Sequence, residues 1–345
     1  MKHLFKKTLF ILMVVMLIIS MTACSTETTA PETPEEPEIE EASETVEKGS
    51  MRVAALNGPT GMGMVGLMDS SESGEAGLDY EFTLMSSPDE LVGKIINGEV
   101  DVAAVPTNLA SVLYNRTEGQ VQLAAVNTLG VLYVLEDGDT IHSVEDLKGK
   151  TVNISGKGAT PDFAFQYILQ QNQLEADKDV MLDFALQHAD LAAAAVEGDV
   201  TIALLPQPHV TSALMRNQNL RIALDITAEW NKVTNNEGQL AMGAIIVQKE
   251  FAENNKALLD EFLKEYEASV NFVNQEMEAA AALIEKYGIL PNAAIAKNAI
   301  PYSNIVYIDA QEAKSFVQEF YEVLFSFDPR SVGGQLADDG FYYEK

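Results

Sequence analysis

The stretch GEVDVAAVP, residues 98–106, returns in altered form as GDVTIALLP at residues 198–206. Each copy begins with glycine and an acidic residue, continues as a run of small and branched apolar residues, and ends at a proline. A short apolar run bounded by turn residues is typical of a strand that is buried on both faces, as in a parallel sheet. The repetition predicts two similar structural units within one chain.

The segments in front of the two strands repeat as well. The strands 51–56 and 150–155 each lead into a glycine-rich turn and then a helix, which reaches residue 68 in the first copy and spans 162–170 in the second. Thr60 lies 46 residues before Pro106, and Thr160 lies 46 residues before Pro206. Between the members of each pair, the pattern predicts a strand and then a helix: 80–84 and 89–96 in the first half, 180–185 and 189–196 in the second. This β-α-β-α-β order favours an α/β fold with two mostly parallel sheets.

The rest of the chain contains two predicted crossings between the halves. Strands 121–127 and 131–135 follow each other with only Thr128, Leu129 and Gly130 between them. The strand 220–226 returns through the polar loop 231–238 into the strand 240–248. Helices 255–286 and 309–325 and an irregular tail, 331–345, complete the chain. We therefore expect one lobe from residues 51–128 and 239–345, and a second lobe from residues 129–238.

The N-terminus predicts an exported protein. Three lysines precede the apolar run Leu9–Ile19, and small residues lead to Cys24, so residues 1–23 have the features of a signal peptide. The apolar run is too short for a comfortable membrane span. Cys24, the only cysteine, resembles the lipid-bearing cysteine of a bacterial lipobox, although Met21 replaces the usual leucine. An ordinary secretory signal with an incidental cysteine is the alternative.

Residues 24–50 are expected to form a disordered acidic tether. From Ser25 to Ser50 the chain has nine glutamates, one lysine and three prolines, which leaves too few apolar side chains for a core. Without the three lysines of the signal segment the formal charge falls from -30 to -33, and the tether's net -8 leaves about -25 for residues 51–345. A protein this acidic is not expected to bind nucleic acid.

The carboxyl ends of the predicted parallel strands indicate where a ligand would bind. Loops and helix N-termini converge there, and first-turn amides can hold a polar or anionic group. The candidate residues of the first lobe are Asn57, Gly58, Thr60, Gly61, Met62, Thr107, Asn108, Asn127 and Thr128. Those of the second lobe are Lys157, Gly158, Ala159, Thr160, Gln207, His209 and Trp230.

Several candidates have a second, purely structural interpretation. Thr160 and Asn108 are each placed to cap a helix, with Pro161 at the first helical position after Thr160. Lys157 is as compatible with solvent as with an anion, and Met62 with the core. Trp230, the only tryptophan, could stack on a ligand or pack inside. His209 could simply end a loop, and His142 and His188 are interpreted as surface or packing residues.

Other chemistries find little support in the sequence. Residues 61–66, GMGMVG, match the G-x-G-x-x-G dinucleotide pattern, but Met85, Ser86 and Ser87 stand where its acidic residue would follow the second strand. There is no Walker A sequence, H-E-x-x-H, C-x-x-C or G-x-S-x-G. Four scattered histidines predict neither a metal site nor a catalytic triad. We expect no cofactor and no metal.

At this point a family resemblance is visible. Residues 53–68, the two repeated strands and the segment SVEDLKGKTV, 143–152, resemble the nitrate/sulfonate/taurine and thiamine-pyrimidine-precursor group of periplasmic-binding proteins, type II. The resemblance implies two lobes of mixed, mostly parallel sheet with two hinge crossings, closing on a small molecule. It also implies partnership with an ABC permease and its ATPase, and a monomer held to the extracytoplasmic face of the membrane.

The ligand and one alternative role stay open. Sulfonate, nitrate or taurine-like anions suit the glycine turns, but no arginine lies in the candidate loops to clamp them. A pyrimidine precursor stacked on an aromatic side chain is the other possibility. A biosynthetic enzyme of the thiamine-pyrimidine type and a ligand-sensing surface lipoprotein are the alternative functions.

Overall fold

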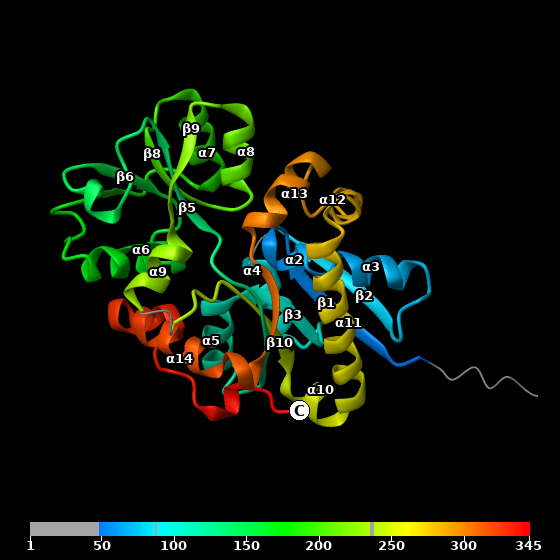
Figure 1. Ribbon diagram of the computed structural model, residues 1–345. Coiled ribbons are helices and arrows are strands. Elements are labelled where there is room, and N and C mark those ends of the chain that lie inside the picture. Colours follow the sequence, from blue (N-terminus) through cyan, green and yellow to red (C-terminus); the bar gives the residue numbers. More distant parts are fainter. Residues whose placement is uncertain (1–47, 87, 235–237) are drawn as a thin grey trace, which may run out of the picture. The chain divides into compact units, whose positions relative to one another are not determined.

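Two β-sheets organise the chain. The computed structural model describes residues 48–86, 88–234 and 238–345. One sheet has the strand order β11-β4-β10-β3-β1-β2, with bounds Ile305–Asp309, Val121–Thr128, Gly243–Gln248, Val102–Pro106, Ser50–Leu56 and Asp79–Met85. The other has the order β7-β6-β8-β5-β9, with bounds Met181–Asp183, Thr151–Ile154, Ile202–Pro206, Leu132–Asp137 and Leu220–Asp225. The two repeated stretches are β3 and β8, and each lies inside its sheet (Figure 1).

Both sheets are mixed, with parallel pairing around the repeated strands. β1 pairs in parallel with β2 and β3, whereas β10 runs antiparallel to β3 and β4, and β11 runs antiparallel to β4. In the second sheet β6 pairs in parallel with β7 and β8, and β5 is antiparallel to β8 and β9. The predicted α/β fold with two mixed, mostly parallel sheets is confirmed.

Burial on both faces explains the apolar composition of the repeated strands. Successive side chains of a strand point to opposite faces. In β8, Ile202 and Leu204 enter one hydrophobic cluster, while Ala203 and Leu205 enter another. β3 divides its side chains between two clusters in the same way. A polar residue at any of these positions would lie in a core, so the sequence is apolar throughout.

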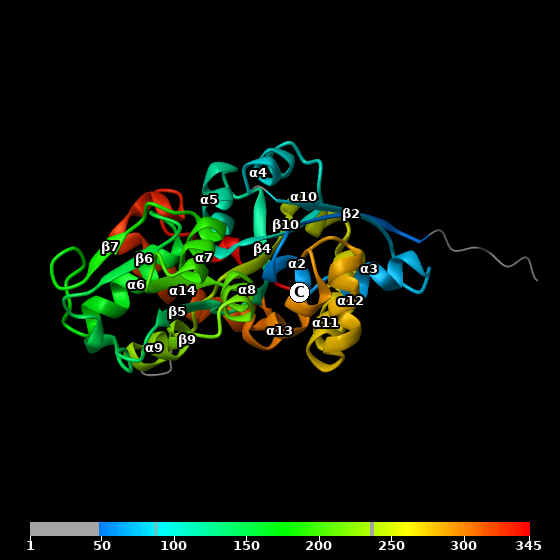
Figure 2. The same cartoon turned by 90° about the horizontal axis from the view of Figure 1, so that it is seen from above.

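Helices cover both sheets. Around the first sheet and along the C-terminal part lie α2 (Pro59–Met62), α3 (Val65–Glu72), α4 (Pro88–Ile96), α5 (Thr107–Arg116), α10 (Lys249–Asn254), α11 (Lys256–Gln275), α12 (Met277–Lys286), α13 (Ala293–Ala299) and α14 (Ala310–Phe327). Around the second lie α6 (Thr160–Gln171), α7 (His188–Glu197), α8 (His209–Arg216) and α9 (Ile226–Val233). Figure 2 shows α3, α11 and α12 grouped on one side of the first sheet, where they contact one another.

Several predicted elements need correction. The expected helix up to residue 68 is broken into α2 and α3, and the expected helix 255–286 is divided at Glu276. α9 begins directly after β9, so the first part of the predicted loop 231–238 is helical; Asn235, Asn236 and Glu237 lie outside the described residues. The sequence analysis also missed α13 and β11, because short elements of mixed composition have weak periodicity.

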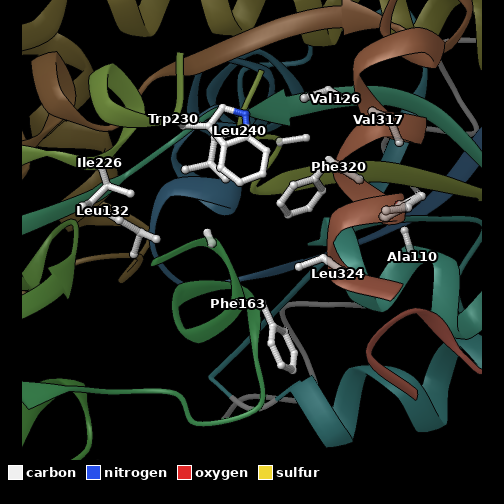
Figure 3. Close-up of a cluster of buried hydrophobic side chains, with 14 of the residues drawn as sticks. Ala110, Val126, Leu132, Phe163, Ile226, Trp230, Leu240, Val317, Phe320 and Leu324 are labelled. Carbon is white, nitrogen blue, oxygen red and sulfur yellow. The ribbon is translucent and has the colours of Figure 1, made fainter. Parts of the chain in front are cut away.

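One hydrophobic cluster includes residues from both sheets. α14 packs against β4 of the first sheet and against α6 beside the second. Its Phe320 lies edge-on to Trp230 of α9, with ring centroids 5.9 Å apart (Figure 3). Phe327 stacks on Phe163 of α6, with ring centroids 6.0 Å apart. Residues 47–345 accordingly form a single compact unit by their contacts. The predicted lobe boundaries stay a prediction.

The C-terminal tail is packed rather than irregular. It contains the short 3-10 helices η3 (Pro329–Val332) and η4 (Asp339–Phe341). Phe341, Tyr342 and Tyr343 are buried, and the Tyr343 amide donates to the Leu123 carbonyl at 2.8 Å. The sequence pattern suggested a loop because glycine and acidic residues surround these aromatic side chains.

The N-terminal predictions lie mainly outside the described part of the chain. This holds for the signal segment 1–23, for Cys24 and for the tether up to residue 47. Of the predicted tether 24–50, the structure describes residues 48–50: Ser50 is the first residue of β1, and Lys48 Nζ donates to the Ala76 carbonyl at 2.6 Å. The tether itself stays a prediction. Among the described helices, none has the length and apolar character to cross a membrane.

Candidate functional site

The candidate residues of the first sheet meet at one edge. β1, β3 and β4 end there, and β10, running the other way, begins there. The Thr107 amide donates to the Met242 carbonyl at 3.1 Å, and the Met242 amide donates to the Thr128 carbonyl at 2.9 Å. The residue after β3, the residue before β10 and the last residue of β4 are thereby held side by side.

Asn127 and Gly243 close this edge tightly. Asn127 is fully buried; its Nδ2 donates to the Thr60 carbonyl at 3.1 Å, and its Oδ1 accepts from Thr128 Oγ1 at 3.3 Å. A Cβ atom on Gly243 would lie 2.8 Å from Thr60 Cγ2 and 2.9 Å from Thr128 Cβ. Asn127 therefore positions the turn after β1, and its side-chain groups already have partners within the protein.

The edge of the second sheet carries a small group of polar side chains. Ser155 follows β6, and His188 and His209 are the first residues of α7 and α8. Ser155 Oγ is hydrogen-bonded to His188 Nδ1, and the His188 and His209 ring centroids are 5.6 Å apart. These three residues, which we call the His188–His209 group, lie at the carboxyl ends of parallel strands.

The two edges adjoin at the first crossing. The Thr128 carbonyl binds the Met242 amide of the first edge, and the Val131 carbonyl accepts from the Gln207 amide of the second edge at 2.9 Å. Only Leu129 and Gly130 separate Thr128 from Val131, which limits the Cα atoms of Thr128 and Val131 to about 11 Å apart. The carboxyl edges of both sheets are thus brought together by covalent continuity of β4 and β5.

Two buried polar atoms at equivalent positions lack partners. Thr107 follows β3 and Gln207 follows β8, and both side chains are at most 2% exposed. Thr107 Oγ1 and Gln207 Nε2 have no hydrogen-bond partner among the described residues. The other end of the Gln207 amide, Oε1, accepts from Thr211 Oγ1 at 2.8 Å. Seven further buried polar atoms among the described residues, Trp230 Nε1 among them, also lack a partner. Buried polar groups are usually hydrogen-bonded, so what distinguishes Thr107 and Gln207 as positions for a water or a ligand is their equivalent place after the two repeated strands.

The two glycine turns each contain a glycine with positive φ but differ in electrostatics. Gly58 and Gly158 both have positive φ, 101° and 72°, which glycine adopts without a steric penalty. In the second turn the Gly158 amide donates to the carboxylate of Asp162, at 2.8 Å, and Asp162 is only 4% exposed. The Gly158 amide already has an anionic partner, which corrects our expectation that it binds a ligand.

Burial controls the charge of the histidines. The pKa of His188 lies below the ordinary histidine value because burial disfavours the charged ring. Burial, followed by repulsion from His188, lowers the pKa of His209 to about 4. Both rings are therefore neutral at pH 7. Neutral imidazoles can donate or accept a hydrogen bond without bringing charge to the site.

The structure divides the predicted site residues into groups. Asn57, Thr60, Asn108, Lys157, Ala159 and His209 lie at the two edges with some exposure. Neither Thr160 nor Asn108 caps a helix, because α6 and α5 start at Thr160 and Thr107, and Ala159 and Pro106 hold the cap positions. Gly58, Thr128 and Thr160 are buried at these edges. Gly61 and Met62 are buried within α2, and Met62 belongs to the core.

Trp230 corrects the prediction of a ligand-stacking side chain. Its indole is 1% exposed and lies 5.1 Å from the Tyr167 ring, between α9, α6 and α14 (Figure 3). It belongs to the hydrophobic cluster that both sheets share. The structural interpretation, a packing residue, is the right one.

Sequence reasoning missed two residues of the second edge. His188 was assigned to the surface or to packing, and Ser155 was treated only as the end of a strand. Both follow parallel strands in the way His209 follows β8. Applying the strand-end rule to every parallel strand would have found them. Within the described residues no three histidine, cysteine or acidic side chains are grouped to hold a metal ion.

Comparison with known proteins identifies the family. Residues 72–289 match the family described as the periplasmic substrate-binding protein of phosphonate ABC transporters. The chain belongs to this family of periplasmic substrate-binding proteins. The binding protein has no match among curated protein sequences.

Solved structures share the fold of this binding protein. An ABC transporter protein from Parabacteroides distasonis is 25% identical, with a TM-score of 0.72 over 86% of this chain and 99% of its own. The periplasmic aliphatic sulphonate binding protein SsuA from Escherichia coli is 17% identical, with a TM-score of 0.67 over 86% and 92%. The nitrate-binding protein NrtA from Synechocystis PCC 6803 is 12% identical, with a TM-score of 0.58 over 82% of each chain.

These findings give the binding protein its general role. It is the extracytoplasmic substrate-binding component of an ABC transporter, with the type II periplasmic-binding protein fold. The family consists of solute-binding proteins and not of enzymes, so the alternative of a biosynthetic enzyme is set aside.

Proposed function

We propose that this protein captures a small oxyanion, of the phosphonate, sulfonate or nitrate type, between the carboxyl edges of its two sheets. The observation that carries the proposal is the pair of unpaired polar atoms, Thr107 Oγ1 and Gln207 Nε2, at equivalent places on adjoining edges. A ligand oxygen would accept a hydrogen bond from each. The family match to phosphonate-binding proteins supports the same class of ligand.

An aromatic ligand receives less support. The pyrimidine alternative relied on stacking, and the only tryptophan lies in the core. Phe184 is near the second edge, but the face of its ring is already occupied, because the Lys157 ammonium lies over it at 5.3 Å from the ring centroid. Lys157 is also the one basic side chain among the candidate residues, which suits an anion better than a neutral heterocycle.

The mature protein is further proposed to be a monomer that is tethered to the membrane by a lipid on Cys24. The lipobox-like sequence and the acidic, proline-containing segment after it support this. Ligand contacts made by both lobes would favour the closed form, which would deliver the solute to a permease and its ATPase. The lobes are proposed as residues 51–128 with 239–345, and 129–238. A surface sensor would bind its ligand without such delivery.

A thermal-shift screen tests the ligand class. Methylphosphonate, ethanesulfonate, nitrate and the pyrimidine cytosine are each added to the soluble protein lacking residues 1–24. A ligand at one hundred times its Kd stabilises the native state by about 2.7 kcal/mol, which raises the Tm by several degrees. An oxyanion that raises the Tm supports the proposal. A shift with cytosine alone, or no shift with any probe, contradicts it.

The anchor has its own test. The full-length chain and its Cys24→Ala variant are expressed in a bacterium fed a labelled fatty acid. Label on the wild-type protein and its loss in the variant are expected. Equal labelling, or none on either protein, contradicts lipid attachment at Cys24.

A further inference from the structure

The His188–His209 group stands out because the oxyanion site has so little positive charge. Among the described candidate residues Lys157 is the only basic side chain, and residues 51–345 carry a net charge of about -25. In the second glycine turn the buried Asp162 carboxylate adds negative charge beside the predicted anion position. An anion that entered this site would meet a single positively charged candidate side chain, the exposed Lys157, and the opposing charge of Asp162.

The histidines are the side chains at this edge that can acquire charge. Their ring centroids are 5.6 Å apart. Each histidine is the first residue of its helix, and Ser155 Oγ is hydrogen-bonded to Nδ1 of His188. That bond leaves Nε2 of His188 unused by Ser155. Two imidazolium ions at this separation would repel each other strongly, so the pair can accept one proton more easily than two.

Resting on the proposed function, we propose that the His188–His209 group takes up one proton together with an anionic ligand. Ligand and proton then enter as a nearly neutral pair, and the imidazolium donates a hydrogen bond to a ligand oxygen. The proton comes from solvent, and no covalent bond of the ligand changes. Gln207, which directly precedes Pro208 and α8, offers its buried, unpaired Nε2 on the same edge.

We expect the proton to be bound by the two imidazole rings and not by the other charged groups nearby. The charged side chains on the elements around the two rings are, in chain order, Lys157 in the turn after β6, Asp183 at the end of β7, Asp190 and Glu197 of α7, Arg216 of α8, Arg221 and Asp225 of β9, and Lys297 of α13. Asp183 is exposed and accepts the Ala185 amide at 2.9 Å. The pKa of His188 is lowered by burial alone, and that of His209 by burial and by His188.

Proton uptake has a measurable direction. Without ligand, the pKa of His209 is about 4, and burial lowers the pKa of His188 below the ordinary histidine value, so both rings are neutral at pH 7. A bound anion raises the pKa of the pair, so between the free and the bound pKa the affinity rises as pH falls. Affinity increases by up to tenfold for each pH unit in that range when one proton is taken up.

Calorimetry of ethanesulfonate, methylphosphonate and nitrate binding at pH 6 tests the proposal. Titrations in two buffers without phosphonate or sulfonate groups, Bis-Tris and succinate, reveal the protons bound per ligand from the difference in heat. Ethanesulfonate and nitrate do not titrate near this pH, so their proton count belongs to the protein. The count for methylphosphonate is corrected for its own ionisation.

Histidine variants test whether the proton is bound by His188 and His209. We expect an uptake near one proton in the wild type and near zero in the double variant His188→Gln with His209→Gln, whose affinity should also lose its pH dependence. His142→Gln is the matched control, because His142 is exposed on the loop after β5 and should leave the uptake unchanged. If the double variant fails to fold, the test is the pH dependence of affinity in the wild type and in His142→Gln. Affinity that rises as the pH falls in both supports the proposal, and affinity that does not change with pH contradicts it.

The outcomes separate this inference from the proposed function. Oxyanion binding without proton uptake, or with uptake that survives in the double variant, overturns the inference and leaves the function standing. Binding of cytosine but of no oxyanion, or no binding at all, overturns both.

Discussion

At the scale of single residues, a buried hydroxyl group stabilises or destabilises the fold depending on whether it has a hydrogen-bond partner. Ser111 is buried on α5, where its Oγ donates to the Val332 carbonyl at 2.9 Å. Thr107, at the start of the same helix, is equally buried but has an unpaired Oγ1. A paired hydroxyl stabilises the fold by about 1 kcal/mol, whereas an unpaired one weakens it unless something binds there.

Thr107→Val should therefore lower affinity without destabilising the empty protein. Valine keeps the shape and removes the unpaired hydroxyl, so the free energy of unfolding should stay the same or rise. Loss of one hydrogen bond to the ligand should weaken binding by roughly 2–12-fold. Calorimetric titration and urea unfolding check both effects. Ser111→Ala is the control: it should lose about 1 kcal/mol of stability and keep its affinity. Equal affinity in Thr107→Val and wild type would place the ligand elsewhere.

Glu136 predicts a pH effect on stability. Its carboxylate is 3% exposed, accepts bonds from Thr140 and the Ile141 amide, and pairs with Arg221 at 2.6 Å. Burial raises the pKa of Glu136, but the Thr140 and Ile141 hydrogen bonds and the Arg221 charge outweigh it, so the net pKa is lowered. The stabilisation is therefore present above the unfolded pKa, about 4.3, and is lost as pH falls through the folded value.

Glu136→Gln should lower the free energy of unfolding at pH 7 by about 1.5–3 kcal/mol, because Arg221 loses its buried carboxylate partner and keeps only the exposed Asp139 and the Gly138 and Ile141 carbonyls. The difference from wild type should shrink as the pH falls from about 5 to 3. Thermal unfolding across this range measures it. Glu99→Gln, which removes an exposed partner of Lys94, should leave the Tm nearly unchanged at pH 7. A constant Tm difference at all pH values would contradict the role of Glu136.

At the scale of elements, the position of β10 depends on close contact. β10 begins at Gly243, and its first residue lies against the side chains of Thr60, Asn127 and Thr128, which hold the ends of the turn after β1 and of β4. The strand supplies the antiparallel link between β3 and β4. Its approach is possible because no side chain stands at this position.

Gly243→Ala should destabilise the protein by about 1–3 kcal/mol through overpacking. It should also weaken ligand binding, because β10 and the turn after β1 would move apart. Urea unfolding and calorimetry measure the two effects. Gly93→Ala on α4 is the control: nothing lies within 4 Å of the new methyl, and alanine favours helix over glycine by up to about 1 kcal/mol. Similar stability for both variants would show that the contact at Gly243 relaxes freely.

At the scale of the whole molecule, the described residues share a core between their two sheets. The cluster around α14 includes Val126 of the first sheet, Leu132 of the second and Trp230 of α9 (Figure 3). Because separating the sheets would expose this shared surface, the two halves are expected to unfold together.

The single tryptophan reports on this shared core. Urea unfolding followed by Trp230 fluorescence and by far-UV circular dichroism should give coincident transitions. Phe320→Ala should move both curves together to lower urea, because truncating a buried phenylalanine costs about 3–5 kcal/mol. Separate midpoints, or a shift in only one signal, would show that the lobes unfold independently.

Local patterns were sufficient for the repeated strands and for the strand ends at which the candidate residues lie. Strand alternation, glycine turns and strand ends are properties of neighbouring residues, so the sequence predicted β3, β8 and the clustering of Thr60, Thr107 and Thr128. It did not predict that Asp162 would use the Gly158 amide, because this competition depends on the rotation of the first turn of α6. It also missed His188, whose neighbours Ser155 and His209 lie 33 and 21 residues away along the chain.

By itself, the sequence determined the α/β class, the duplicated units and the strand ends at which polar side chains gather, because these follow from short-range periodicity and turn chemistry. Only the tertiary structure decided that Trp230 packs inside, that α14 connects the two sheets, and that the tail around Tyr343 is anchored. These outcomes depend on which apolar surfaces meet after the chain has folded back: Trp230 lies 63 residues from Tyr167 and 90 from Phe320, and Tyr343 lies 220 residues from Leu123. Local sequence carries no information about such contacts.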